Sequence, residues 1–202
     1  MSGGPRPRRR APAKPVRGAL RVVTGDLRGR RFDVPGGDAT RPTGDRVREA
    51  TFGALGSLGA IDGARVLDAF AGSGALGIEA LSRGAAHVTF AETDRAALDV
   101  LRTNLTTLDL RDRSTVAPVD GVRASASGGP WDLVLLDPPY AFERWDDLLD
   151  GVAAALAPDG VVVVESDREV ALPAGLATVR VRRYGSTVVA IASPTGDPGA
   201  PS

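Results

Sequence analysis

The sequence contains no cysteine and a single histidine, His87. The absence of cysteine excludes disulfide bonds, thiolate metal sites and catalysis by a cysteine nucleophile. A single histidine excludes metal sites with several imidazole ligands, and it leaves a Ser/His/Asp hydrolase only His87 as its base. No apolar run approaches the roughly 20 residues that a membrane-spanning helix needs, and the N-terminal arginines are not followed by the apolar core of a secretory signal. We therefore expect a soluble, cytoplasmic protein without a metal site.

Charge is unevenly distributed, although the 25 basic and 25 acidic residues cancel over the whole chain. Residues 1–31 hold ten basic residues and one acid, whereas the remaining 171 residues carry 15 basic and 24 acidic groups. A basic arm on an acidic body indicates contact with a polyanion such as nucleic acid. A solvated leader that only aids solubility would have the same composition, so this alternative stays open.

The length of 202 residues fits one domain with short appendages. Both ends are rich in Pro and Gly and are expected to be disordered. Next to the N-terminal tail, two short β-like runs around Thr24-Gly25-Asp26 predict a hairpin, and a helix is expected from about Asp45 with Thr43 as its cap. The predicted division is a basic tail at 1–18, a hairpin and helix extension at 19–60, a main domain at 61–193 and a second tail at 194–202.

From Ala64 onward, short apolar runs alternate with helical patterns, which is typical of a parallel sheet covered by helices. The final runs ATVRVRRY and STVVAIA flank Gly185 too closely for a crossover helix, so they predict an antiparallel hairpin at the sheet edge. The fold class is therefore α/β, with a doubly wound, Rossmann-like sheet of about seven strands. The predicted strands before the hairpin are 65–70, 87–92, 114–119, 132–137 and 161–166, and the predicted helices are 75–83, 95–107 and 144–157.

A glycine-rich turn follows the first of these strands. Gly72, Gly74 and Gly77 satisfy GxGxxG, and Glu92 ends the next strand, 20 residues after Gly72. This spacing is typical of a Rossmann nucleotide site, in which the acid holds ribose hydroxyls. Asp68 would repel the pyrophosphate of NAD, but it suits a cationic ligand head such as the ammonium of S-adenosylmethionine (SAM). The pattern favours SAM over an NAD(P) oxidoreductase, while a simple turn-capping role for Asp68 stays open.

Asp120-Gly121 closes the third predicted strand. A carboxylate at this point can accept the amino hydrogens of adenine. Asp-Gly is also a common turn, so both roles remain open for this pair.

The tetrad Asp137-Pro138-Pro139-Tyr140 follows a buried strand at the predicted centre of the sheet. Proline has no N–H to donate and stiffens the loop, so the Asp137 carboxylate and the Pro138 carbonyl are fixed acceptors. Two fixed acceptors match the two hydrogens of a planar exocyclic amine, and Tyr140 offers a face on which a base can stack. The alternative is a plain diproline turn, but the glycine loop upstream favours the catalytic interpretation.

Taken together, these motifs resemble the class I SAM-dependent amino-methyltransferases. More narrowly, two flanking motifs resemble the bacterial 16S rRNA guanine-N2 methyltransferases, and this resemblance covers about residues 19–192. The flanking motifs are Arg41-Pro-Thr-Gly-Asp-Arg-Val-Arg-Glu49 and Arg183-Tyr-Gly-Ser-Thr187. Gly53 departs from the family pattern, which has Asn after the Phe of the first helix.

The resemblance implies methyl transfer from SAM to the N2 amine of a guanine in small-subunit rRNA or the assembling small subunit, by a monomer. Thr43 and Asp45 would close over the cofactor, and the arginines of that segment would contact RNA phosphate or dock the helix. The implied cofactor-binding residues are Asp68, Phe70, Gly72, Ser73, Gly74, Glu92, Thr93, Asp120, Gly121 and Thr43; the catalytic residues are Asp137, Pro138, Pro139 and Tyr140; and the RNA-binding residues are Arg8, Arg9, Arg10, Arg41, Arg46 and Arg48.

Two other function classes use the same fold. DNA or RNA adenine-N6 or cytosine-N4 methyltransferases share the tetrad, although no stretch here is large enough for a DNA target-recognition domain. A non-catalytic RNA-binding assembly factor could keep the fold, but it would be expected to have lost the tetrad or the glycine loop.

Overall fold

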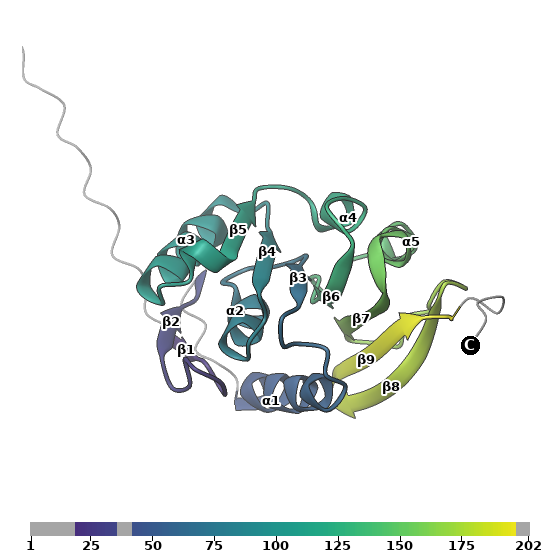
Figure 1. Ribbon diagram of the computed structural model, residues 1–202, viewed down its shortest axis with the longest axis horizontal. Coiled ribbons are helices and arrows are strands. Elements are labelled where there is room, and N and C mark those ends of the chain that lie inside the picture. Colours follow the sequence, from purple (N-terminus) through teal and green to yellow (C-terminus); the bar gives the residue numbers. More distant parts are fainter. Residues whose placement is uncertain (1–18, 36–41, 197–202) are drawn as a thin grey trace, which may run out of the picture.

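The structure, a computed structural model, describes residues 19–35 and 42–196, and its centre is a seven-stranded sheet (Figure 1). The strand order is β5-β4-β3-β6-β7-β9-β8. Neighbouring strands from β5 to β7 pair in parallel, whereas β9 pairs antiparallel with both β7 and β8. The predicted doubly wound sheet with a C-terminal hairpin is confirmed. The strands are β3 (Arg65–Asp68), β4 (His87–Ala91), β5 (Ser114–Ala117), β6 (Trp131–Leu136), β7 (Leu156–Ser166), β8 (Leu176–Tyr184) and β9 (Thr187–Pro194).

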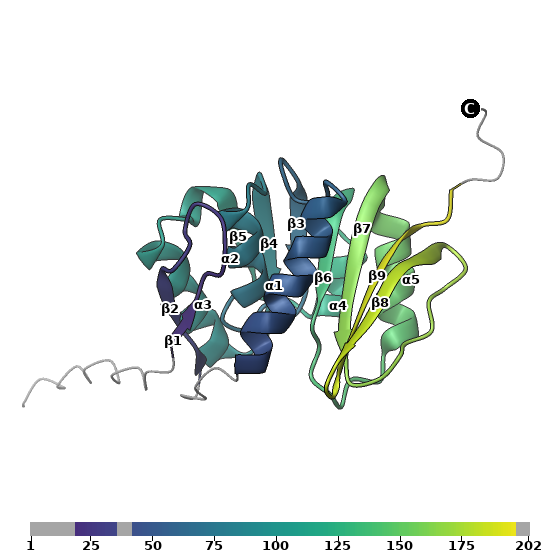
Figure 2. The same ribbon diagram turned by 90° about the horizontal axis from the view of Figure 1, so that it is seen from below.

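Helices cover both faces of this sheet (Figures 1 and 2). Helices α1 (Pro42–Ser57), α2 (Ala75–Ser82) and α3 (Arg95–Thr107) lie on one face, and α4 (Gly121–Ser125) and α5 (Trp145–Ala155) lie on the other. A 3₁₀ turn at Arg111–Arg113 precedes β5.

Alternate residues of the central strands enter two separate hydrophobic clusters. Val66 and Leu135 belong to the cluster under α1, α2 and α3, whereas Leu67, Val134 and Leu136 pack with α5. Burial on both faces explains why these strands are continuous apolar runs. The same alternation directs the side chain of Asp68, at the end of β3, toward the α1 and α2 side.

The N-terminal hairpin is also confirmed, as β1 (Ala19–Arg21) pairs antiparallel with β2 (Arg31–Asp33). Glu79 of α2, only 1% exposed, fixes the turn of this hairpin by accepting hydrogen bonds from Val23 N at 2.8 Å and Thr24 N at 3.0 Å. Gly25 has φ +87°, and a Cβ there would lie 1.9 Å from the Ser82 carbonyl oxygen, so this close approach requires glycine. The extension therefore packs firmly on the main sheet domain.

Several predicted boundaries differ from the structure, and one short helix was not predicted. Helix α1 begins at Pro42 rather than near Asp45, because proline suits the first helical position, and Thr43 lies inside the first turn. Helix α4 begins directly after Asp120, at a position where the sequence predicted either a turn or an adenine-binding residue. Strand β9 extends to Pro194, and Thr195 N donates to Gly175 O at 3.0 Å, so the C-terminal tail does not begin at residue 194.

The predicted tail at 1–18, with Arg8, Arg9 and Arg10, lies outside the described residues, as does Arg41. In the part of the chain that the structure describes, no helix is long and apolar enough to cross a membrane. Nor do residues 19–35 and 42–196 bring together three or more His, Asp or Glu side chains that could hold a metal ion.

Candidate active site

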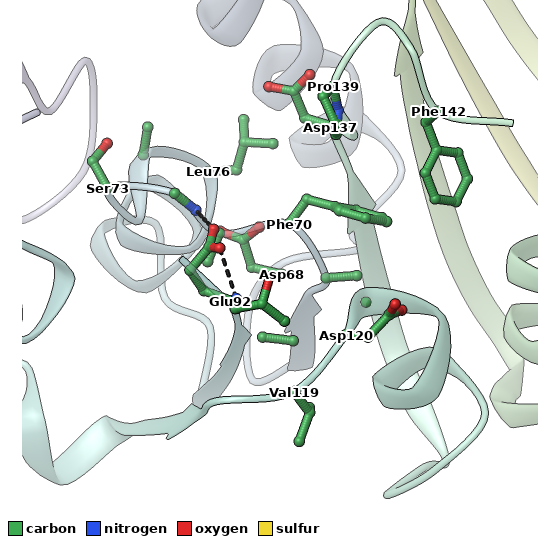
Figure 3. Close-up of a pocket in the computed structure, with 17 residues that line it drawn as sticks. Asp68, Phe70, Ser73, Leu76, Glu92, Val119, Asp120, Asp137, Pro139 and Phe142 are labelled. Atoms are coloured by element: carbon green, nitrogen blue, oxygen red, sulfur yellow. Dashed lines mark hydrogen bonds between the residues drawn. The ribbon is translucent and has the colours of Figure 1, made fainter. Parts of the chain in front are cut away.

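A cavity of about 610 Å³ opens at the carboxyl ends of β3, β4 and β6 (Figure 3). The chain leaves β3 toward β4 on one side and later returns to β6 on the other, so the cavity lies at the topological switch point where α/β proteins bind ligands. The predicted site residues that line it are Asp68, Phe70, Gly72, Ser73, Glu92, Thr93, Asp120, Gly121, Asp137 and Pro139.

Glu92 organises the glycine loop. One carboxylate oxygen accepts a hydrogen bond from Gly72 N at 2.8 Å, and the other accepts from Thr93 N and Asp94 N, each at 2.7 Å. These backbone donors orient the carboxylate at the cavity wall (Figure 3). A carboxylate has about four acceptor positions, so one remains for a ligand hydroxyl.

Two glycines of the GxGxxG pattern serve packing beside the cavity, which neither of them lines. Gly74 has φ +88°, and a Cβ there would lie 2.6 Å from Leu101 Cδ1. A Cβ on Gly77 would lie 2.2 Å from Phe90 Cε1 of β4. Gly77 therefore allows α2 to approach the sheet, and Gly74 allows the turn that precedes this helix.

Asp68 is a buried carboxyl, 1% exposed, at the floor of the cavity. Its Oδ2 accepts a hydrogen bond from Gly77 N at 2.9 Å, so the capping role is real. Burial raises the pKa of Asp68 to about 7, and the charges of Asp137 and Glu92 add to this rise. Because a buried carboxylate is costly without a cationic partner, the site fits a ligand that carries a positive charge, such as the ammonium group of SAM.

The far end of the cavity has an aromatic wall and a glycine floor. Phe142 packs edge-to-face on Phe70 and Trp145, with ring centroids 5.3 and 5.2 Å apart. A Cβ on Gly121 would lie 2.3 Å from the Ala69 carbonyl oxygen, so only glycine fits between strand and helix here. This end suits a flat ring such as adenine.

Asp120 is already engaged at the same end. Its Oδ1 caps α4 by accepting from Val122 N at 2.7 Å, and its Oδ2 lies 3.3 Å from Arg144 Nη1. The sequence left a turn role and an adenine-binding role open for Asp120. The structure shows the capping role, and both residues of the pair line the cavity.

The tetrad loop, residues 137–140, lies across the cavity from the glycine loop. Asp137 and Pro139 line it, Pro138 is buried, and Tyr140 is 62% exposed and does not line it. Asp137 is open to solvent on the cavity side and accepts no hydrogen bond within the described chain. The protein atoms packed around it nevertheless raise the pKa of its carboxyl to about 6.

Sequence reasoning missed Phe142, which lines the cavity, and Glu165, which lies beside Asp137 without lining the cavity. Leu136 of β6 pairs with Val164 of β7, so the next residues, Asp137 and Glu165, lie side by side at the same edge of the sheet. Burial and the charge of Asp137 raise the pKa of Glu165 to about 7, although the Arg48 guanidinium opposes the rise. The only sequence signal for Glu165 was its position directly after the apolar run Val161–Val164. The only sequence signal for Phe142 was its position two residues after the tetrad.

The arginines of α1 divide into two groups. Arg48 is 6% exposed, and its Nη2 donates to Arg21 O at 2.8 Å and to Asp45 Oδ1 at 3.0 Å. Its Nε also lies 3.8 Å from Glu79 Oε2. RNA binding by Arg48 was therefore a wrong prediction, whereas the alternative of docking the helix is confirmed. Arg46 is exposed and remains a candidate.

Comparison with known proteins adds independent findings. Residues 20–193 match the model of the family described as conserved hypothetical protein 95. The chain is 40% identical over 181 residues to "Putative rRNA methyltransferase YlbH" of Bacillus subtilis (strain 168), covering 85% of this chain and 97% of that protein. It is 41% identical over 159 residues to "Ribosomal RNA small subunit methyltransferase D" of Escherichia coli (strain K12), covering 77% of this chain and 79% of that protein.

A solved structure has the same fold. "Putative methyltransferase yhhF" from Escherichia coli superposes with a TM-score of 0.79 at 36% sequence identity. The superposition covers 89% of this chain and 100% of that chain. The family model's match, residues 20–193, extends over the N-terminal hairpin, α1 and the sheet domain.

Proposed function

The chain belongs to the conserved hypothetical protein 95 family, and from this premise we propose that it transfers a methyl group from SAM to the exocyclic N2 amine of a guanine in small-subunit rRNA. The observation that carries the proposal is that carboxylates suited to the cofactor and to the acceptor base line one cavity from opposite sides. Asp68 and Glu92 stand beside the glycine loop, and Asp137 stands opposite them on the tetrad loop. The names of the two relatives, both rRNA methyltransferases, support the substrate class.

The cofactor half of the cavity consists of the glycine loop, Asp68, Glu92 and the aromatic end with Gly121. Asp68 would hold the ammonium group of the methionine end, and Glu92 would accept a hydrogen bond from a ribose hydroxyl. Phe70 and Phe142 would enclose the adenine ring. When bound, SAM supplies an electrophilic methyl group on a sulfonium centre.

The acceptor half consists of the tetrad loop and Glu165 beside it. Asp137 and the Pro138 carbonyl would accept the two amine hydrogens of guanine, which fixes the nitrogen in line for transfer. Both acceptors also stabilise the positive charge that develops on this nitrogen. With a pKa of about 6, Asp137 is largely ionised at neutral pH and can take the proton that the methylated amine releases.

The exposed Tyr140 would provide a stacking platform for the base. A guanine inside a paired stem cannot reach the tetrad, so the target is a loop nucleotide or a base flipped out of its stack. We further propose that the chain acts as a monomer in the cytoplasm, on rRNA that is free or within an assembling small subunit. Residues 61–193 would form the catalytic domain, with 19–60 as an extension that docks RNA.

The experiment that tests this function measures transfer of a labelled methyl group from SAM to unmodified small-subunit rRNA, both free and in assembled particles. Large-subunit rRNA and duplex DNA serve as matched controls. Label in small-subunit rRNA alone is the expected result. Transfer to DNA alone would favour an adenine-N6 or cytosine-N4 enzyme, and the absence of both transfer and SAM binding would overturn the proposal.

A further inference from the structure

A second cavity, of about 200 Å³, separates α1 from the β8–β9 hairpin. Figure 2 shows α1 and this hairpin beside each other on the sheet. The α1 wall carries the small side chains of Ala50 and Ala54, which leave the space open. We call this space the α1–β8 groove and define it by its polar lining residues Thr51, Arg180, Arg182 and Tyr184.

Strand register explains why two arginines face this groove. Arg180 pairs with Ile191 and Arg182 pairs with Val189. Both partners belong to the hydrophobic cluster under α1, and paired residues of antiparallel strands point to the same face. Arg183 lies between Arg182 and Tyr184 in the strand. Its side chain therefore points to the opposite face, and it does not line the groove.

The groove is electropositive. No acidic residue lines it, and neither Arg180 nor Arg182 forms an ion pair with any described residue. The hydrogen bond that Arg182 donates is to the neighbouring Val181 carbonyl oxygen, at 3.3 Å. Charged side chains on an edge strand also discourage pairing with other chains. That role does not require a cavity, and it does not require both arginines to point to the same face of the sheet.

Thr51 provides a second, independent observation. This residue of α1 is 5% exposed and lines the groove, and its hydroxyl has no hydrogen-bond partner within residues 19–35 and 42–196. A buried hydroxyl without a partner is costly. Its oxygen has almost no accessible surface, so Thr51 must change its rotamer before the hydroxyl can donate to an anionic oxygen bound in the groove.

The groove also lies in line with the acceptor half of the active site. At the carboxyl edge, Asp137 follows β6 and lies beside Glu165 of β7. Glu165 pairs with Val189, and Val189 pairs with Arg182. With strands about 4.8 Å apart, three spacings put the Arg182 backbone roughly 14 Å from that of Asp137. An RNA strand that presents a base at Asp137 can therefore pass over the groove.

We propose that the α1–β8 groove binds backbone phosphates of the RNA nucleotides next to the target guanine. Arginine forks match phosphate oxygens, and phosphate contacts fix the register of a nucleic acid without reading its sequence. The groove would thus hold the flanking strand while the tetrad receives the base. This inference rests on the proposed function, because it takes the substrate to be RNA.

The test compares the double variant Arg180→Ala/Arg182→Ala with Arg183→Ala, a matched control that removes an exposed arginine from the opposite face of the same strand. Affinity for a small-subunit rRNA fragment is measured at several salt concentrations, together with kcat, the KM for RNA and the SAM affinity. For the double variant we expect RNA affinity to fall at least about tenfold. The slope of log affinity against log salt should flatten by about one for each phosphate that the variant no longer neutralises.

The control should stay within about twofold of the unmodified protein, and both variants should keep kcat at saturating RNA and the SAM affinity. Arg180→Lys/Arg182→Lys should restore most of the salt slope, because lysine keeps the charge but not the fork. Equal RNA affinity for the double variant and the control would refute phosphate binding in the groove, while leaving the proposed function intact. If the unmodified protein binds rRNA through these arginines but methylates no RNA, the proposed function is refuted and the RNA-binding role of the groove stands.

Discussion

The cofactor half and the acceptor half of the active site differ in how their carboxylates are held. In the cofactor half, Glu92 accepts three backbone hydrogen bonds and Asp68 accepts one, from Gly77 N. In the acceptor half, Asp137 and Glu165 accept none from the described residues, and Tyr140 is 62% exposed. The cofactor half is therefore preorganised by backbone hydrogen bonds, whereas the carboxylates of the acceptor half have no hydrogen-bond donor among the described residues.

This difference has a physical reason. A cofactor that binds in one way gains affinity from a preorganised site, because little conformational entropy is lost on binding. Under the proposed function, the acceptor half instead receives a base that has left its stack, and the amine hydrogens of that base would satisfy its free acceptors. Substitutions in the cofactor half should therefore change SAM binding, whereas those in the acceptor half should change transfer or RNA binding.

The largest effect is expected for Asp137→Ala. The variant loses an acceptor that stabilises the charge developing on the amine, so kcat should fall by about 10²–10³-fold or more. The SAM affinity should stay within about threefold. Asp159→Ala, which removes an exposed carboxylate far from the tetrad, is the control. Methyl transfer at the unmodified rate in Asp137→Ala would refute the role of the tetrad.

The next effect is expected in the cofactor half, for Glu92→Gln. The amide keeps the size of the side chain but loses the charge and one acceptor oxygen. Hydrogen bonds to charged groups contribute about 1.5–3 kcal/mol, so SAM affinity measured by titration calorimetry should fall about 10–100-fold. The kcat at saturating SAM should change little. Glu49→Gln on the exposed side of α1 is the control, and equal SAM affinities in the two variants would contradict the assignment.

A smaller effect is expected for Tyr140→Ala. Base stacking on an aromatic ring contributes about 1–3 kcal/mol, so the KM for RNA should rise about tenfold. The melting temperature should not change, because the ring is 62% exposed. Tyr140→Phe keeps the stacking face and should restore the KM. A Phe variant as weak as the Ala variant would show that the hydroxyl, and not the ring face, is what matters.

The smallest effect concerns stability and its pH dependence. The pKa of Asp68 rises from 3.8 to about 7 on folding, so the folded chain binds this proton more tightly than the unfolded chain. The corresponding stability is complete below about pH 4 and is lost as the pH rises toward 7. Asp68→Asn should therefore raise the free energy of unfolding at pH 8 by about 1–2 kcal/mol, and flatten its pH dependence between pH 4 and 7.

Urea unfolding at several pH values measures this effect, and SAM titration of the same variant should show weaker binding. Such a variant would be more stable and less functional, as expected for a carboxyl that is kept for a ligand rather than for the fold. A less stable Asp68→Asn at pH 8 would instead mean that its hydrogen bond to Gly77 dominates.

Features of regular period or fixed spacing could be predicted from the sequence. The apolar runs predicted the parallel strands, and the short connection around Gly185 predicted the final hairpin. The glycine spacing placed Asp68 and Glu92 in one cavity. Helix α4 could not be predicted, because its five residues are too few for a helical period.

Long-range contacts explain the other errors. Arg48 was a candidate for RNA binding because nothing near it in the chain reveals Glu79, the buried acid that it approaches after folding. Glu165 was missed because its role depends on which strand lies beside β7. Such partners are set by strand order and helix packing, and a single sequence shows neither.

The chemical identity of the methylated nucleoside decides whether the protein is a guanine-N2 methyltransferase. Unmodified small-subunit rRNA would be incubated with the protein and SAM, digested to nucleosides and analysed by mass spectrometry. We expect N2-methylguanosine at one site. N6-methyladenosine or N4-methylcytidine would contradict the guanine assignment while keeping the fold and the transfer chemistry, and unmethylated RNA in the presence of bound SAM would contradict the substrate.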